Sequence, residues 1–212
     1  MSKQQANISL SKIFKNHKSK EAILYLVSKD KDLLNLFIEN SDFGEYKREK
    51  NFKGLLQLII EQQLSVASAN AIYRKLLKKT LSISPESILN LNHDSLKECG
   101  LSRQKISYIS GLAKNCFNKE INFNKINKLS DDDLITEITK IKGIGPWTAQ
   151  CYMLACLKRG DIWPVADLGL MEAVKRIKKL KKRPTEIEME KISQKWRPYR
   201  STVANVLWAS YD

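Results

Sequence analysis

Residues 141–150 read IKGIGPWTAQ, a short corner between two stretches whose apolar residues recur at helical intervals. Leu134, Ile138 and Ile141 lead into it, and PWTAQCYMLACLKR follows it. A glycine after a helix permits a turn with positive φ, and a second glycine lets another backbone approach closely. Pro146 suits the first turn of the next helix, where no amide hydrogen is needed. The corner predicts a helix N-terminus whose amides point outward and hold a phosphate oxygen, with an ordinary helix-loop-helix turn as the alternative.

The remainder of the chain also has helical periodicity, and no alternating strand pattern or Gly/Pro/Ser-rich linker interrupts it. SKEAILYLVSKDKDLLNLFIEN forms one helix or two helices broken near Lys29–Asp30, and residues 52–77 break at EQQLS. Ser84 and Ser130 are predicted helix caps. The fold class is therefore predicted to be all-α, with further helices over residues 102–117, 131–141, 146–159, 167–180 and 196–212.

Composition restricts the classes of partner and of site. The net charge of +14 favours a polyanion, nucleic acid first and an anionic membrane second, although a lysine-rich compositional habit is the alternative. The N-terminus has no apolar core of signal-peptide length, and no apolar run is long enough to span a bilayer. Only two histidines are present, which argues against a histidine-based metal site. The cysteines lack C-x-x-C spacing and are predicted to be buried thiols in a reducing compartment: Cys99, Cys116, Cys151 and Cys156.

LITEITKIKGIGPWTA followed by DIWPVADLGL resembles the helix-hairpin-helix DNA glycosylases that carry a Gly/Pro-rich loop and a catalytic aspartate, the HhH-GPD superfamily. IIEQQLSVASANAIYRKL, GLSRQKISYISGLA and WRPYRSTVANVLW are similar to its alkylpurine branch, 3-methyladenine DNA glycosylase II. The resemblance covers residues 20–211 and implies one unit over 1–212, a two-lobed helical bundle. One lobe spans about 50–160 and has the hairpin at its C-terminal end; segments 20–50 and 160–212 form the other.

The resemblance implies a monofunctional DNA glycosylase that flips alkylated purines out of the duplex and excises them by hydrolysis in base excision repair. These are bases of the 3-methyladenine and 7-methylguanine class. Asp167 matches the catalytic carboxylate, which stabilises the sugar as it becomes positively charged; a simple helix N-cap is the alternative reading. Trp147 occupies the position where strand-nicking relatives carry a Schiff-base lysine, so water is the expected nucleophile. Lys142 is out of register for that role.

The resemblance also implies a pocket, a DNA-contacting surface and a cation site. The pocket residues are Trp147, Trp208, Tyr152 and Cys151, with Tyr46 and Trp163 as weaker candidates. The DNA contacts are Gly143, Ile144, Gly145, Lys142 and Thr148, together with the EQQLS residues Gln63, Leu64 and Ser65. Of these, Gln63 aligns with the wedge that fills the gap left by the flipped base, and a shift of one residue selects Leu64 instead. The backbone carbonyls of Thr139, Ile141 and Ile144 match a monovalent cation site.

No other cofactor is expected. Because no cysteine follows Cys156, the chain lacks the four closely spaced C-terminal cysteines with which other relatives hold an iron–sulfur cluster. The basic run KRIKKLKKR (175–183) is either a solvated helix face or a contact to the DNA backbone.

The expected partner is double-stranded DNA containing alkylated bases, bound by a monomer with no membrane association. The expected location is cytoplasmic and nucleoid-associated in a bacterium, or nuclear in a eukaryote. Two other functions stay open: a DNA-binding protein that uses the hairpin as a phosphate clamp without chemistry, and a bifunctional glycosylase/lyase for oxidised bases. The first has no need of Asp167.

Overall fold

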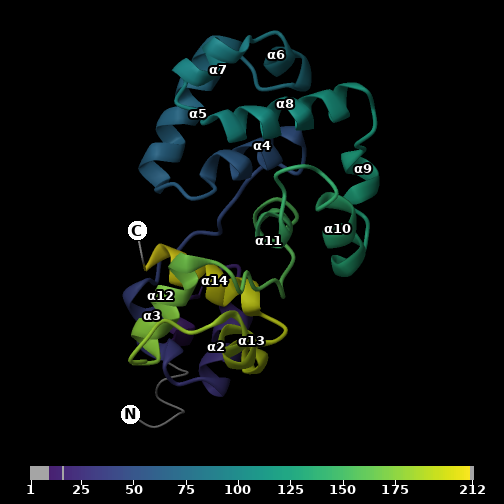
Figure 1. Cartoon of the computed structure of the whole chain (residues 1–212). Coiled ribbons are helices and arrows are strands. Elements are labelled where there is room, and N and C mark those ends of the chain that lie inside the picture. Colours follow the sequence, from purple (N-terminus) through teal and green to yellow (C-terminus); the bar gives the residue numbers. More distant parts are fainter. Residues whose placement is uncertain (1–9, 16, 211–212) are drawn as a thin grey trace. The chain divides into compact units, whose positions relative to one another are not determined.

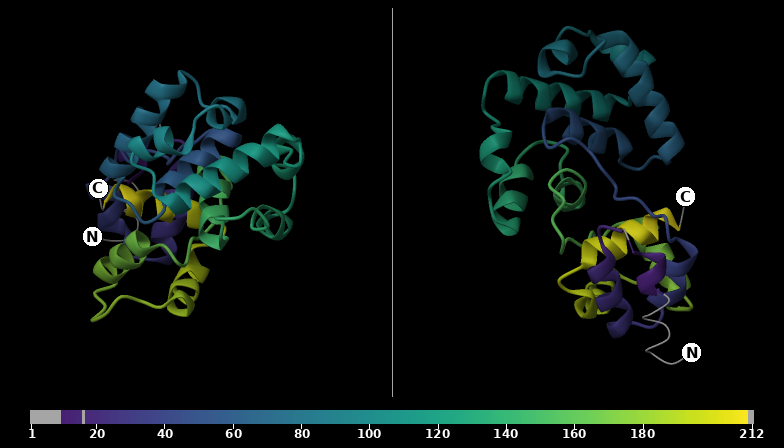
Figure 2. Two further views of the ribbon diagram at one scale, coloured as in Figure 1. Left: turned by 45° about the horizontal axis from the view of Figure 1, so that its top comes forward. Right: turned by 180° about the vertical axis from the view of Figure 1, so that it is seen from behind.

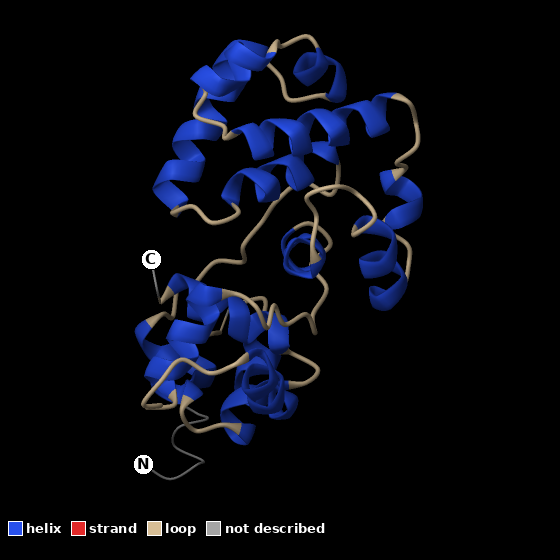
Figure 3. Cartoon of the chain, viewed as in Figure 1, coloured by secondary structure: helices blue, strands red, loops and turns tan. Residues whose placement is uncertain are grey.

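A computed structural model describes residues 10–15 and 17–210 of the chain, and in this part every regular element is a helix (Figure 3). The all-α prediction is therefore confirmed. The chain divides into two compact units. We call Lys47–Lys158 the hairpin unit, and the combination of Met1–Tyr46 with Arg159–Asp212 the split unit. Among the described residues, no helix has the length and apolarity that a membrane crossing requires.

The hairpin unit is continuous in sequence and is built around α4 and α8, which lie side by side (Figures 1 and 2). One face of α8 covers α4 and another contacts α6, while α11 packs against both α4 and α10. The apolar residues of α4 are buried almost without exception, which makes it the centre of this core. The helices are α4 (Phe52–Glu61), α5 (Val66–Thr80), α6 (Pro85–Leu89), α7 (His93–Glu98), α8 (Arg103–Phe117), α9 (Phe123–Ile126), α10 (Asp131–Ile138) and α11 (Pro146–Ala155).

The predicted helix boundaries in this unit follow local capping chemistry. The break at EQQLS is confirmed, since α4 ends at Glu61 and α5 begins at Val66. Ser84 accepts a hydrogen bond from the Ser87 amide in a capping box, and Ser130 accepts one from Asp133, so both predicted caps are confirmed.

The split unit combines helices from both ends of the chain. In it, α12 packs on α14, and α14 also contacts α3 (Figure 1). The chain breaks at Asp30, which confirms the two-helix alternative for the N-terminal segment. The predicted helix over 196–212 begins only at Arg200 because Pro198 interrupts helical bonding, and residues 211–212 lie outside the described part. The elements are α2 (Lys20–Lys29), α3 (Leu33–Glu39), α12 (Leu168–Ile177), α13 (Glu186–Ser193), η1 (Gln194–Trp196) and α14 (Arg200–Ala209).

The buried carboxylate of Asp30 connects the N-terminal and C-terminal segments of the split unit. Asp30 is 3% exposed and accepts hydrogen bonds from the Lys178 ammonium at 2.6 Å and the Trp196 indole at 2.7 Å. Burial by itself raises the pKa of Asp30, but the bonds from Lys178, Trp196 and Lys195 outweigh it and hold that pKa below its ordinary value. Lys178 therefore belongs to the interior, although the basic run that contains it was predicted to lie in solvent or along DNA.

Candidate active site

Asp167 is the N-cap of α12, and its side chain is held by two neutral donors. The Oδ1 atom accepts a hydrogen bond from the Leu170 amide at 2.8 Å and another from the Trp208 indole at 3.2 Å. The side chain is nearly buried, with 9% of the residue exposed. Asp167 therefore has the geometry of a helix N-cap, which fixes the orientation of its carboxylate. Neither the Leu170 amide nor the Trp208 indole carries a formal charge.

The surroundings of Asp167 combine a small residue with two aromatic rings. A Cβ atom on Gly169 would lie 3.2 Å from Asp167 Oδ1 and 4.0 Å from Trp208, so glycine leaves room for this hydrogen-bonded pair. The half-buried Trp208 ring meets Tyr46 edge-on, with centroids 5.5 Å apart. Tyr46 was only a weaker candidate in the sequence, and the structure brings it beside the predicted pocket aromatic.

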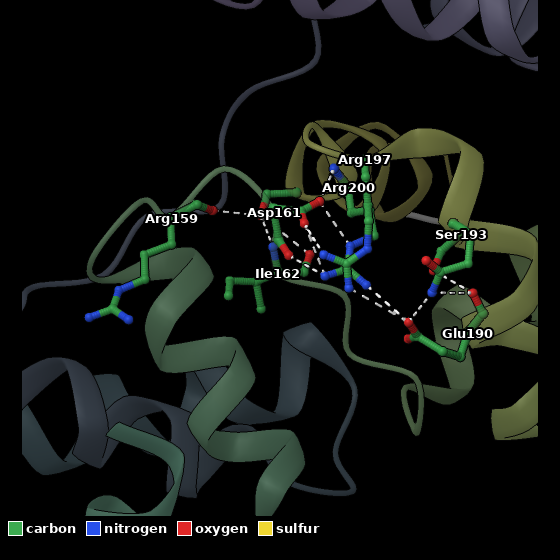
Figure 4. A network of polar contacts seen from close by, with 9 residues as sticks. Arg159, Asp161, Ile162, Glu190, Ser193, Arg197 and Arg200 are labelled. Atoms are coloured by element: carbon green, nitrogen blue, oxygen red, sulfur yellow. Dashed lines mark hydrogen bonds and ion pairs between the residues drawn. The ribbon is translucent and has the colours of Figure 1, made fainter. Parts of the chain in front are cut away.

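The loop that leads to Asp167 is pinned at its start by α14 (Figure 4). The Arg200 guanidinium donates to Asp161 Oδ1 at 2.9 Å and to the Asp161 carbonyl at 2.7 Å. The Ser201 hydroxyl donates to the Arg159 carbonyl at 2.6 Å and accepts from the Ile162 amide at 2.9 Å. Because Trp208 of the same helix binds Asp167, α14 holds this loop at both ends.

The Gly-Ile-Gly corner has the predicted backbone geometry. Gly143 adopts φ of 90°, and a Cβ atom there would lie 2.2 Å from the ring of Tyr108, so both conformation and contact require glycine. Gly145 has φ of −95° and nothing within 4 Å of an added Cβ atom. It is the N-cap of α11, no side chain caps it, and Pro146 is the first helical residue. Gly145 and Pro146 are exposed, so this helix start faces outward.

The corner forms one wall of a groove of about 420 Å³ within the hairpin unit. The other walls are the turn at Gln62–Gln63 and residues 102–108 at the start of α8. Thr139, Ile141 and Ile144, whose carbonyls were predicted to bind a monovalent cation, all line this groove. Ile141 and Ile144 are both buried. Among the described residues, no cluster of His, Cys, Asp and Glu side chains is suited to a metal ion.

The EQQLS turn presents its predicted wedge residues to solvent. Gln63 is exposed and adopts φ of 56°, which is uncommon for a residue other than glycine. Leu64 is 40% exposed, and Ser65 caps α5 by accepting from the Ser68 amide. Gln62, by contrast, turns inward: its amide nitrogen donates to the Gly143 carbonyl at 2.8 Å and to the Thr148 hydroxyl at 2.9 Å.

Two residues with predicted site roles are buried and have partners within the hairpin unit. Thr148, a predicted DNA contact, is buried and its hydroxyl accepts a hydrogen bond from Gln62. Tyr152 is fully buried, donates its hydroxyl to Asn127 at 2.8 Å and lies against Phe123, so we assign it to the core of the hairpin unit. Burial raises the pKa of the Tyr152 hydroxyl.

Four other predicted residues have well-defined surroundings. Cys151 is a buried free thiol, as are Cys99 and Cys156, whereas Cys116, which was also predicted to be buried, is a half-buried free thiol. Trp163 is buried edge-on against Trp196, which supports the structural reading of this weaker candidate. Trp147 is half-buried in the first turn of α11, and Lys142 is exposed at the corner.

The sequence analysis missed Lys105, Tyr108 and Gln62. Lys105 donates to the carbonyls of Ile60 and Gln62 at 2.5 and 2.8 Å, and burial lowers the pKa of its ammonium. Gln62 and Lys105 have no local signal in the sequence, because their partners lie 43 or more positions away. The hydroxyl of Tyr108 accepts from Gln104 within α8, but its contact with Gly143 depends on the fold.

Comparison with known proteins places this geometry in a family. The family described as "HhH-GPD superfamily base excision DNA repair protein" matches residues 56–198. The chain is 32% identical over 162 residues to the alkylbase DNA glycosidase-like protein mag2 of Schizosaccharomyces pombe, which covers 74% of this chain and 76% of the relative. DNA-3-methyladenine glycosylase 1 of the same yeast is 29% identical over 168 residues, 76% and 73% of the two chains.

Among solved structures, the S. pombe 3-methyladenine DNA glycosylase Mag1 in complex with abasic DNA superimposes with a TM-score of 0.80 at 27% identity. That match covers 90% of this chain and 96% of the yeast chain. The 3-methyladenine DNA glycosylase of Archaeoglobus fulgidus shares the fold, with a TM-score of 0.77 at 22% identity, over 97% of this chain and 73% of that one. The chain belongs to the HhH-GPD superfamily of base excision DNA repair proteins.

Proposed function

We propose that this protein is a monofunctional DNA glycosylase, which hydrolyses the N-glycosidic bond of alkylated purines of the 3-methyladenine and 7-methylguanine class. The observation that carries the proposal is the oriented Asp167 carboxylate, held by Leu170 and Trp208 in a chain of a base excision repair family. The matched relatives named as alkylbase or 3-methyladenine glycosylases support the substrate class.

Asp167 is the proposed catalytic residue. As the glycosidic bond lengthens, positive charge develops on the sugar, and a carboxylate fixed beforehand stabilises that charge without reorganising. The same carboxylate orients or deprotonates the attacking water. The neutral amide and indole donors hold Oδ1 in place without an opposing charge of their own. A base methylated at N3 or N7 is already cationic and departs readily, so a strong general acid is not needed.

Trp208 in the split unit and, independently of it, Trp147 in the hairpin unit are each proposed to stack on an everted base. An indole facing a cationic purine gains by stacking and by cation–π attraction, by about 2 kcal/mol when the pair is desolvated. Trp208, beside Asp167, and Trp147, at the start of α11, are both half-buried and keep part of their surface for a ligand. Trp147 supplies no amine for a Schiff base, so water remains the nucleophile and strand cleavage is not part of the reaction.

The hairpin unit is proposed to hold the damaged duplex. The uncapped start of α11 binds a backbone phosphate through its amides, with Gly145 leaving space for the approach. Gln63 and its neighbour Leu64, both exposed, are the proposed wedge. Thr139, Ile141 and Ile144 line the adjacent groove, and their backbone carbonyls are proposed to hold a monovalent cation there. We propose no other cofactor, and we propose that the protein acts as a monomer.

An end-labelled duplex containing one 7-methylguanine tests this function. After incubation, half of the sample is heated in alkali and half is not, and a third portion receives borohydride during the reaction. The proposal predicts cleavage at the lesion only after alkali and no trapped covalent complex. Cleavage without alkali together with a trapped complex would support the bifunctional glycosylase/lyase. Binding without any alkali-sensitive site would support the non-enzymatic clamp.

A further inference from the structure

The side chain of Gln62 binds the Gly-Ile-Gly corner and the helix that follows it. Its amide nitrogen uses both hydrogens, one on the carbonyl of Gly143, the first residue of the corner, and one on the hydroxyl of Thr148 in α11. Gly143 and Thr148 lie 81 and 86 positions further along the chain, so this is a tertiary link and no part of local turn formation. A glutamate of the same length would turn an acceptor toward the Gly143 carbonyl and lose the link.

Lys105 binds the backbone of the same turn. Its ammonium donates to the carbonyls of Ile60 and Gln62, at the end of α4 where helix carbonyls lack partners in the helix. A cation at a helix C-terminus is further favoured by the helix dipole. The backbone of Gln62 is therefore held by Lys105 while its side chain is held by the hairpin.

The outward direction of the next residues follows from this anchoring. Gln63 adopts its left-handed conformation directly after the anchored residue, and the Leu64 amide bonds back to the Glu61 carbonyl at 3.2 Å. The Gln62 side chain thus binds the hairpin, whereas Gln63 and Leu64 are exposed. The turn and the corner line one groove.

We propose that Gln62 and Lys105 are positioning residues, which couple the wedge-bearing turn to the phosphate-holding hairpin so that both engage damaged DNA in one geometry. The inference rests on the proposed function, because it assumes that the turn enters the duplex and the hairpin holds its backbone. Neither residue is assigned a contact to the reacting atoms.

The test compares the affinities of the full chain for two duplexes of one sequence, one undamaged and one containing a stable abasic-site analogue. Gln62→Met removes both side-chain hydrogen bonds at similar length, Gln62→Asn keeps the amide but shortens its reach, and Lys105→Met releases the carbonyls. Gln57→Met is the matched control, because Gln57 lies on α4, the helix that leads into the turn, is half-buried and does not line the groove.

For Gln62→Met, we expect binding to the abasic duplex to weaken about tenfold, the scale of one to two net hydrogen bonds, while binding to the undamaged duplex stays within about twofold. Gln62→Asn and Lys105→Met should lower the same ratio of affinities, and Gln57→Met should leave it unchanged. A purely structural role predicts a lower melting temperature and a proportional loss on both duplexes, and that result would overturn the inference.

This experiment distinguishes a failure of the coupling by Gln62 and Lys105 from a failure of the proposed glycosylase function. If the wild-type protein prefers the abasic duplex and all three variants keep its preference, the coupling is refuted while the glycosylase function stands. If the wild-type protein binds both duplexes equally, the proposed function is contradicted and the coupling falls with it.

Discussion

Replacing Asp167 by asparagine separates the two roles of this side chain. The Oδ1 atom of an asparagine can accept the same hydrogen bonds that Asp167 accepts from the Leu170 amide and the Trp208 indole. Asparagine and aspartate are about equally good N-caps, so the free energy of unfolding should change by less than about 0.5 kcal/mol. The substitution therefore removes the negative charge and leaves the cap in place.

The expected kinetic effect is much larger. Loss of a positioned charge or acid/base group lowers a rate by roughly 10²–10⁴-fold, which corresponds to about 2.7–5.4 kcal/mol of transition-state stabilisation. Asp167→Ala should lose the same rate, and it should also lose the cap and the Trp208 acceptor. Because Trp208 is half-buried and water replaces part of that bond, we expect about 1–2 kcal/mol of destabilisation, or a melting temperature lower by roughly 2–8 °C.

The assay is single-turnover release of methylated purine from duplex DNA, measured together with the melting temperature and the affinity for abasic DNA. Asp167→Asn should melt like the wild type, bind abasic DNA like the wild type and release base slowly. Turnover close to that of the wild type would refute the reasoning and leave Asp167 as a helix cap only. A melting temperature as low as that of Asp167→Ala would show that asparagine does not preserve the cap.

Four further predictions concern the corner, the buried ion pair and the base-stacking residue. Gly143→Ala should lower the melting temperature, because the left-handed φ of Gly143 and the neighbouring ring of Tyr108 exclude a Cβ atom. Gly145→Ala should melt like the wild type, and equal melting temperatures of the two variants would contradict the prediction. Lys178→Met should lower the free energy of unfolding, measured in urea titrations, by about 3 kcal/mol, because the substitution leaves the buried Asp30 with fewer partners. A change below about 1 kcal/mol would contradict this prediction. Because the pKa of Asp30 is lowered in the folded state, the stability that it contributes should be complete above its unfolded pKa and be lost as the pH falls through the folded value. Lys178→Met should weaken this acid dependence, and an unchanged acid profile would show that another group is responsible. Trp147→Ala should slow release of cationic 7-methylguanine more than release of neutral hypoxanthine, and equal losses would indicate that the indole only packs.

The features predicted correctly from the sequence are those with local causes. The serine caps, the break at EQQLS and the Gly-Ile-Gly corner each depend on residues within one helical turn of one another. The missed α13 had such a signal, since Thr185 and Glu188 form a capping box at its start. The missed α9 has only four residues, too few to establish a helical period.

The features that were not predicted depend on contacts between distant segments. Lys178 looked like one more lysine in a basic run, and only the fold brings it to Asp30, 148 positions earlier. Gln62 was given no role from the sequence, because its partner Gly143 lies 81 positions further along the chain. Tyr152 was assigned to the pocket from the family resemblance, and its burial against Phe123 depends on packing that no local pattern records.

The central claim is that this chain breaks the bond between an alkylated purine and its sugar. The most direct measurement is the appearance of free purine, identified by mass, when the wild-type protein is incubated with methylated duplex DNA. The account predicts release of 3-methyladenine and 7-methylguanine well above that from the buffer control, with unmodified purines retained. Release no faster than in buffer, from protein that binds the same DNA, would contradict it.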